Sequence, residues 1–268
     1  MSTPAPAADT ASGEATRPRR PRLRDRMNAE TAIVIFAIPV IVAIGFAAFA
    51  IWNATATKDS VVEGALAWPT VWDQIGGHLK LTFVSAIATV VIAVPLGVLL
   101  TRGRAKAVAP VVVGIANGGQ AAPSVGLIVL FAMWLGFGFR TAVIALTLYA
   151  ILPVLRNTIV GLEGVDRTLV EAGRGVGMSA VAVLLRVELP LALPVIMAGV
   201  RTALVLLVGT ATLATFINGG GLGGTLQTGI SLLRYPVIVW GAVLVALLAL
   251  LIEWLGRVLE LVVRPKGV

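Results

Sequence analysis

Six long apolar runs limit what this chain can fold into. The first, residues 31–52, would be about 33 Å long as a helix, and the hydrocarbon core of a bilayer is about 30 Å thick. The other runs cover residues 79–101, 107–138, 140–160, 191–217 and 236–256. The chain is 58% hydrophobic and only 13% charged, too few polar residues to cover a surface in water. We therefore predict an all-α, polytopic transmembrane helical bundle of about six spans.

The lysine and arginine residues predict the orientation of these spans. With a cytoplasmic N-terminus, 16 of the 21 basic residues fall on the inner side and four on the outer side, while Arg201 lies within a span. This asymmetry places both termini in the cytoplasm. Because the charges lie at span ends, topology explains the net charge of +8, and nucleic-acid binding is not indicated. The lack of cysteine excludes disulfides, thiolate metal sites and cysteine catalysis.

The two ends of the chain differ from the spans. Residues 1–30 are rich in Pro, Ala and Arg and lack apolar periodicity, which predicts a disordered, basic cytoplasmic tail. The "NATA" that follows residues 31–52 resembles a signal-peptide cleavage site. That run exceeds the usual 7–15 residues of a signal core, so we favour an uncleaved anchor. Residues 258–268 are predicted to form a second cytoplasmic tail.

A charged, glycine-rich segment separates the fourth and fifth apolar runs. It reads "EAGRGVGMSAVAVLLRVELP" from residue 171 to residue 190. Thr168 and Glu171 have the spacing of a capping box, and Asp166 could instead cap the same helix.

Two short helices are predicted in this segment. The first would end among Gly173, Gly175 and Gly177, and the second would start near Ser179 and stop before Pro190. Elementary physics leaves two interpretations open. The pair could rest on the lipid headgroups as an amphipathic hairpin, or it could be a docking element for a cytoplasmic partner.

The spacing within this segment resembles the EAA loop of membrane subunits of binding-protein-dependent ABC importers. The matching residues are Glu171, Ala172, Gly177, Val187, Leu189 and Pro190. Gly173 stands where the family usually has a second alanine, which would loosen the first helix by up to about 1 kcal/mol. Val187 stands where the family often has isoleucine. The resemblance implies that these seven residues couple the chain to an ATPase.

Further segments extend the resemblance over roughly residues 80–260. They are "QAAPSVGLIVLFAMWLGFG", "LPVLRNTIVGLEGVDRTLVEAGRGVGMS", "LPLALPVIMAGVRTAL" and "ATFINGGGLGG". Together they are similar to permeases of glycine betaine, choline and carnitine osmoprotectant importers. The resemblance implies a type I ABC-importer permease (MetI-like) core over residues 79–257, with its EAA coupling loop at about 161–190, in the bacterial cytoplasmic membrane.

The same resemblance implies a set of partners. These are a cytoplasmic ABC ATPase subunit, an extracytoplasmic substrate-binding protein and a second permease subunit, identical or homologous. The cargo would be a quaternary ammonium osmoprotectant: glycine betaine, choline, carnitine or proline betaine. In the EAA loop, Glu171 would anchor the contact surface, Ala172 would allow close approach, and Gly177 would form the turn.

The sequence carries no sign of its own catalytic chemistry. It contains no Gly-Lys dipeptide and therefore no Walker A loop, so we predict a non-catalytic subunit without a bound cofactor. ATP and Mg would bind the partner ATPase. The glycine-rich stretch at residues 218–224 falls in an outer loop, where a flexible turn or a contact with an external partner is expected.

Three polar or aromatic features receive structural interpretations. His78 lies near the outer end of a span and is expected to be an interfacial residue. Glu253 and Arg257 have the spacing of an ion pair on one helix face, which argues against proton-driven transport. Five of the six tryptophans lie near span ends or in the first outer loop, so no aromatic cage is evident, as expected if a separate protein selects the cargo.

The third apolar run is interrupted by "NGGQAAPS" at residues 117–124. These polar groups would be unsatisfied in lipid, so they should face a neighbouring subunit or a water-filled cavity. Close packing through Gly114 and Gly118 is one interpretation, and a broken helix that lines a translocation path is the other. The path candidates are Gln120, Pro123, Ser124, Asn157 and Asn218.

Two alternatives to the main functional prediction remain. The chain could serve the same importer class with another small amino acid or zwitterion as cargo. From a different class, it could be a self-sufficient secondary transporter.

Overall fold

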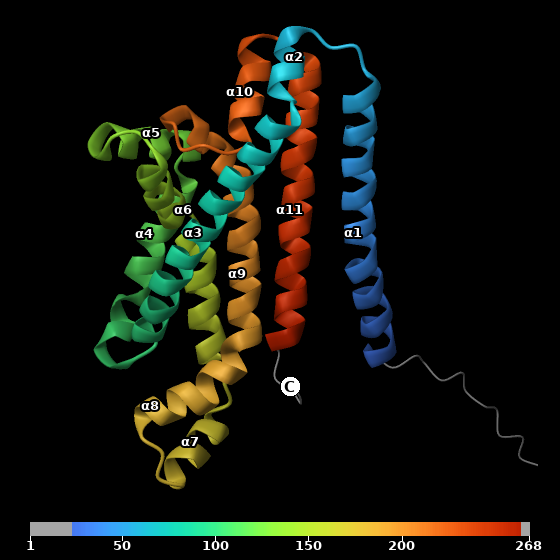
Figure 1. Ribbon diagram of the computed structural model, residues 1–268. Coiled ribbons are helices and arrows are strands. Elements are labelled where there is room, and N and C mark those ends of the chain that lie inside the picture. The colour runs from blue at the N-terminus through green and yellow to red at the C-terminus, as the bar shows by residue number, and fades with distance from the viewer. Residues whose placement is uncertain (1–22, 264–268) are drawn as a thin grey trace, which may run out of the picture.

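The computed structural model describes the backbone of residues 23–263 and the side chains of residues 36–260. This part of the chain is helical and contains no strand. Figure 1 shows long helices standing side by side, with two short helices projecting from one end. The long helices are α1 (Leu23–Thr55), α3 (Trp68–Leu100), α6 (Phe139–Glu163), α9 (Leu189–Ala211) and α11 (Tyr235–Val263).

Shorter elements connect the long helices. They are α2 (Ser60–Ala65), the 3₁₀ helix η1 (Gly103–Val108), α4 (Ala109–Ala121), α5 (Ser124–Leu135), α7 (Arg167–Gly175), α8 (Ala180–Val183), the π-helix η2 (Leu184–Glu188), the 3₁₀ helix η3 (Thr212–Ile217) and α10 (Gly223–Ser231). In the described residues, five helices are long and apolar enough to cross a membrane, or six if the bent pair around α4 and α5 forms one span. The prediction of an all-α bundle of about six spans is confirmed.

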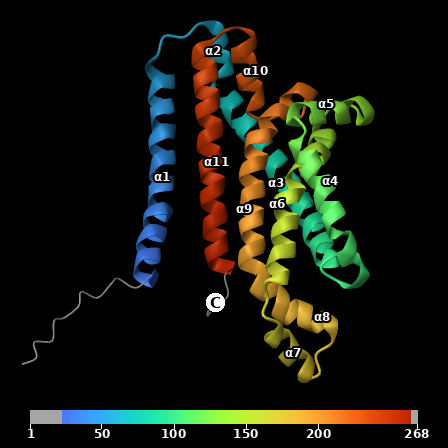
Figure 2. The ribbon, with the colours of Figure 1, turned by 180° about the vertical axis from the view of Figure 1, so that it is seen from behind.

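The break predicted in the third apolar run is present. The segment Gly103–Ala121 meets α5 at an angle of 99°, and Pro123 lies at the corner. In Figures 1 and 2, α5 lies across the end of the bundle opposite to α7 and α8. Within this subunit, Gly114 and Gly118 pack against no other element, since beyond their own helix nothing in the described residues lies within 4 Å of a Cβ placed at either glycine. Close packing of these glycines against a second subunit stays a prediction.

Small residues let α6 pack closely against the helices on both its sides. A Cβ on Gly97 of α3 would lie 2.6 Å from a methyl group of Thr158 on α6. A Cβ on Gly161 of α6 would lie 3.1 Å from the carbonyl oxygen of Ala192 on α9. Without a hydrophobic driving force between helices in lipid, such close backbone approach is the main source of helix association. The core of the bundle therefore forms around α6.

Aromatic rings join α1 to the rest of the bundle. Phe49 of α1 is fully buried, and its ring centroid lies 5.4 Å from those of Trp68 and Trp240. Trp52 also lies 5.4 Å from Trp240. Trp68 and Trp240 thus pack on Phe49, Trp52 packs on Trp240, and these rings hold α1 against α3 and α11.

His78 is buried, so its assignment as an interfacial residue is wrong. The backbone N–H of Leu222 donates to Nδ1 over 3.3 Å, and Nε2 donates to the carbonyl oxygen of Val208 over 3.0 Å. Gly221, at φ +90°, leaves room for this contact, because a Cβ there would lie 2.9 Å from Nδ1. The glycine-rich stretch at 218–224 is therefore bound to α3, and its expected flexibility or contact with an external partner stays a prediction. A buried imidazole with both nitrogens paired satisfies two backbone groups that lipid could not.

The helices next to the two predicted tails extend further into them than expected. Residues 23–30, predicted as disordered, belong to α1, and α11 continues to Val263 within the predicted tail 258–268. Both stretches lack Pro and Gly, so a helix already nucleated in the span continues through them. Residues 1–22 and 264–268 of the predicted tails lie outside the described residues. In Figures 1 and 2, the start of α1 and the end of α11 lie at the same end of the bundle as α7 and α8.

Candidate functional site

Two regions hold the residues that the sequence singled out. The first is residues 166–188, called here the α7–η2 segment, which projects from one end of the bundle in Figure 1. The second is a cavity that opens at the surface of the bundle.

Asp166 caps the first helix of the α7–η2 segment. Its Oδ1 accepts a hydrogen bond from the backbone N–H of Thr168 over 2.9 Å and another from the Thr168 hydroxyl. These two hydrogen bonds lower the pKa of Asp166, since they favour the ionised carboxylate. Of the two predicted caps, Asp166 is therefore the one in use, and Thr168 supports it.

The turn after α7 depends on Gly177. This residue has a φ of +88°, in the left-handed region that favours glycine. Its N–H donates to the carbonyl of Arg174 over 2.9 Å, and the N–H of Met178 donates to the carbonyl of Gly173 over 3.1 Å. This pair of hydrogen bonds is the Schellman motif, which satisfies the last carbonyls of α7. The predicted glycine turn is confirmed at this position.

The second short helix does not stop before Pro190, so this prediction is wrong. Ser179 caps α8 as expected, with its Oγ 3.2 Å from the N–H of Ala182. However, α8, η2 and α9 follow one another without a break, and the helical path from Ala180 to Ile217 is counted as one candidate span. Pro190 is tolerated because it lies in the first turn of α9, directly after the wider π turn. The part of the projecting segment from Ala180 on is thus a continuous extension of a membrane-spanning helix.

The EAA-like residues divide into an exposed and an internal group. Glu171, Ala172 and Gly177 are exposed. Gly173 is buried, and a Cβ there would lie 3.4 Å from both Met178 and Val183, an ordinary contact distance. The alanine usual in the family would therefore fit, and this position packs α7 on α8.

The remaining EAA-like residues lie where the segment joins the bundle. Val187, Leu189 and Pro190 are partly buried. Their positions make them part of the internal packing of η2 and α9, while the exposed group is free to meet another molecule.

Apolar side chains are also exposed on the α7–η2 segment. They include Val176 (79% exposed), Val181 (64%) and Leu185 (58%). Apolar surface gathered on a small polar projection is typical of an interaction site. The sequence alone did not mark these residues as an interaction site, because apolar side chains are equally expected where helices pack together.

Two ion pairs hold the connection between α3 and α4 in place: one reaches the α7–η2 segment and the other reaches the end of α6. Arg102 forms a two-pronged pair with Glu188, which is only 5% exposed. Burial lowers the pKa of the Arg102 guanidinium, and the nearby charge of Arg174 lowers it further. Lys106 Nζ lies 2.8 Å from Oε1 of Glu163. The segment is therefore fixed to the bundle through side chains as well as through α9.

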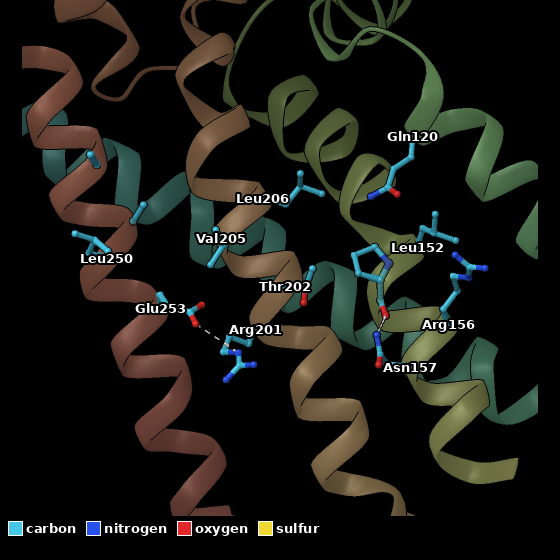
Figure 3. A pocket seen from close by; sticks show the side chains of 13 residues that line it. Gln120, Leu152, Arg156, Asn157, Arg201, Thr202, Val205, Leu206, Leu250 and Glu253 are labelled. Carbon is cyan, nitrogen blue, oxygen red and sulfur yellow. Dashed lines mark hydrogen bonds and ion pairs between the residues drawn. The ribbon is translucent and has the colours of Figure 1, made fainter. Parts of the chain in front are cut away.

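The second region is a cavity of about 1080 Å³ bounded by α4, α6, α9 and α11, called here the α6–α9–α11 cavity. Figure 3 shows side chains from these helices around it. Its polar lining residues are Gln120, Arg156, Asn157, Arg201, Thr202 and Glu253. Among the predicted path residues, Gln120 and Asn157 lie together here. Pro123 and Ser124 are not among its lining residues, and Asn218 lines a separate hollow with Asp73 and Lys80.

The walls of this cavity are held in place by backbone contacts. Gln120 Nε2 donates to the carbonyl of Tyr149 over 3.3 Å, which joins α4 to α6. Asn157 Nδ2 donates to the carbonyl of Pro153 over 2.8 Å. Gly199 allows α9 to approach at this point, because a Cβ there would lie 2.6 Å from Cβ of Asn157.

An ion network closes one side of the cavity. Glu253 accepts from Arg257 Nε over 3.0 Å, which confirms the predicted pair. Its Oε1 also lies 3.6 Å from Nε of Arg201, and Arg201 Nη1 lies 3.1 Å from Oε2 of Glu260. The network therefore joins α9 to α11. Sequence reasoning placed Arg201 within a span but found neither its partners nor the place of Arg156 on this cavity. The available signal was a charged residue inside the apolar runs 140–160 and 191–217.

Comparison with known protein families identifies the family of this chain. Residues 93–265 match the family described as "Binding-protein-dependent transport system inner membrane component". The chain belongs to this family.

Similar proteins of known function cover most of the chain. The glycine betaine/carnitine/choline transport system permease protein OpuCB of Bacillus subtilis is 44% identical over 72% of this chain and 88% of its own length. The osmoprotectant import permease protein OsmW of Salmonella typhimurium is 41% identical over 71% and 90%. A chain of the inward-facing MetNI methionine ABC transporter is 28% identical, with a TM-score of 0.63 over 74% of this chain and 100% of that one.

These findings confirm the predicted type I ABC-importer permease core. The protein is a multi-pass inner-membrane permease of a binding-protein-dependent ABC importer, a class of subunit that is generally non-catalytic. The α7–η2 segment and all residues that line the α6–α9–α11 cavity lie within the matched range.

Proposed function

We propose that this protein is the membrane subunit through which an ATP-driven importer moves a quaternary ammonium osmoprotectant into the cell. The observation that carries the proposal is the 44% identity, over 194 residues, to a glycine betaine/carnitine/choline permease. Cargo would be glycine betaine, choline, carnitine or proline betaine, delivered by an extracytoplasmic binding protein.

The α7–η2 segment is the proposed docking site for a separate ABC ATPase, which would bind ATP and Mg. Its exposed Glu171, Ala172 and Gly177 match the EAA pattern, and its apolar neighbours offer surface to bury. Because α8 and η2 run into α9, movement of the docked segment would be passed to the membrane-spanning part of the permease. The internal residues Gly173, Val187, Leu189 and Pro190 would keep the segment rigid.

A second permease subunit, identical or homologous, would complete the pathway. The α6–α9–α11 cavity opens at the surface of a single subunit and holds charged groups that lipid would not accommodate. A partner across this face would convert it into a closed path with Gln120 and Asn157 on its wall. With the ATPase inside, the start of α1 and the end of α11 would be cytoplasmic, because both lie at the α7–η2 end of the bundle (Figure 1).

The proposal is tested by purifying the native complex in mild detergent, identifying what co-purifies and reconstituting it in liposomes. We expect an ABC ATPase to co-purify, and ATP-dependent uptake of glycine betaine, carnitine or choline when the cognate binding protein is added. Uptake by the isolated chain under an ion gradient would instead identify a secondary transporter and refute the proposal.

The likeness to the methionine importer favours one second candidate. In it, the same machinery carries another small amino acid or zwitterion. Direct binding measurements on the cognate binding protein separate the two, since that protein selects the cargo.

A further inference from the structure

Two arginines face the α6–α9–α11 cavity from different helices, and their surroundings differ. Arg201 on α9 is neutralised by Glu253 and Glu260, and its stem packs on Gly256, where a Cβ would lie 3.3 Å from Cγ of Arg201. Arg156 on α6 is exposed toward the cavity, and no side chain of residues 36–260 pairs with it. The guanidinium of Arg201 is therefore already paired within the bundle, and that of Arg156 is available to bind a ligand.

The position of Arg156 makes an unpaired charge costly. It lies seven residues from Glu163 at the end of α6, or about 10 Å along a helix, within a candidate span. An ionised side chain at such a depth faces a cavity or pairs with another group. The charged lining consists of Arg156, Arg201 and Glu253, so the cavity carries one net positive charge.

We propose that Arg156 binds the carboxylate group of a zwitterionic cargo as it passes through this cavity. The inference rests on the proposed function and narrows its cargo class. A guanidinium binds a carboxylate through two parallel hydrogen bonds, which an ammonium cannot do. Gln120 and Asn157, each held through one amide hydrogen by a backbone carbonyl, line the same cavity and offer it further polar groups (Figure 3).

The other end of such a cargo meets no comparable partner on this subunit. Among residues 36–260, no aromatic side chain lines the cavity, so this subunit offers a trimethylammonium group no cage. Recognition through the carboxylate alone gives weak binding, which suits a passage that must release its cargo. Glycine betaine and carnitine carry a carboxylate, and choline does not. The net positive charge of the cavity therefore disfavours binding of choline, which is a cation.

The test measures weak binding directly, by saturation-transfer NMR on the intact permease–ATPase complex in nanodiscs with glycine betaine or choline as ligand. We expect R156Q to weaken glycine betaine binding at least tenfold, and R156K to retain part of it. The matched control is R140Q, the same change at an exposed arginine on the opposite end of α6. We expect R140Q to bind glycine betaine as the unchanged protein does, and choline to give no specific signal.

Several outcomes overturn the inference: no glycine betaine signal from the unchanged complex, equal binding of choline, or equal losses in R156Q and R140Q. ATP-driven uptake by the unchanged complex separates this failure from that of the proposed function. If uptake proceeds but binding does not depend on Arg156, only the inference fails. If no quaternary ammonium compound is taken up, the proposed function fails.

Discussion

The α7–η2 segment and the α6–α9–α11 cavity are built in opposite ways. The segment is a continuous stretch in which a cap, a glycine turn and a second cap follow one another between Asp166 and Ser179. The cavity gathers residues from position 120 to position 253, on four helices that meet only in the folded bundle. Local interactions define the first region, and helix packing defines the second.

This difference teaches where function can be read from sequence. A capping carboxylate or a left-handed glycine acts on its immediate neighbours, so its sequence position reveals its role. Arg156 and Arg201 have similar sequence surroundings, and only the approach of α11 gives a carboxylate partner to one of them. The predictions below test this contrast.

The largest effect is expected for G177R in the α7–η2 segment. Arginine at φ +88° strains the turn and places a bulky charge on the exposed face, so ATPase association should be lost and uptake should fall at least tenfold. Co-purification and uptake assays measure both. The control is G136R, at φ +83° and the opposite end of the bundle, where a Cβ also meets nothing within 4 Å. Normal ATPase binding by G177R would remove the docking assignment.

The next effect concerns the joint between the two regions. E188Q removes the charge that pairs with Arg102 and leaves a guanidinium partly buried without its partner. We expect a loss of about 3 kcal/mol in the free energy of unfolding, measured in mixed detergent micelles. K106Q breaks the more exposed pair with Glu163 and should cost less than about 1 kcal/mol. Similar losses from both variants would contradict the distinction.

A smaller effect is expected for G199A in the cavity wall. The new methyl group would lie 2.6 Å from Cβ of Asn157 and 2.7 Å from the Pro153 carbonyl oxygen, so α9 must shift, at a cost of about 2 kcal/mol. G209A on the same helix meets nothing within 4 Å and should stabilise the protein by up to about 1 kcal/mol. The same unfolding assay decides, and an unchanged stability in G199A would argue against this packing.

The smallest effect is expected for the cap of α8. S179A removes the hydrogen bond to the N–H of Ala182 and should lower stability by about 1 kcal/mol. S124A makes the same change at the start of α5, where no side-chain cap is present, and should have little effect. A larger loss in S124A than in S179A would show that the local signals of the α7–η2 segment do not define its helix.

Much of the fold was predictable because lipid imposes strong rules. The spans, the break near Pro123 and the turn at Gly177 each follow from composition or from a single residue type. The error at Pro190 arose because a proline that ends most helices is tolerated in a first turn, and a π turn before it leaves no sequence mark. The error at His78 arose because its partners are backbone groups of Val208 and Leu222, more than 100 residues away.

The sequence by itself determined that the chain is a membrane-embedded helical bundle and where its projecting segment begins and turns, because apolar runs, caps and glycines act over a few residues. Only the tertiary structure decided that Arg201 is neutralised while Arg156 is not, and that Gln120 and Asn157 share a cavity that excludes Asn218. Charge balance and cavity shape depend on which helices approach one another, and that is set by packing between distant residues.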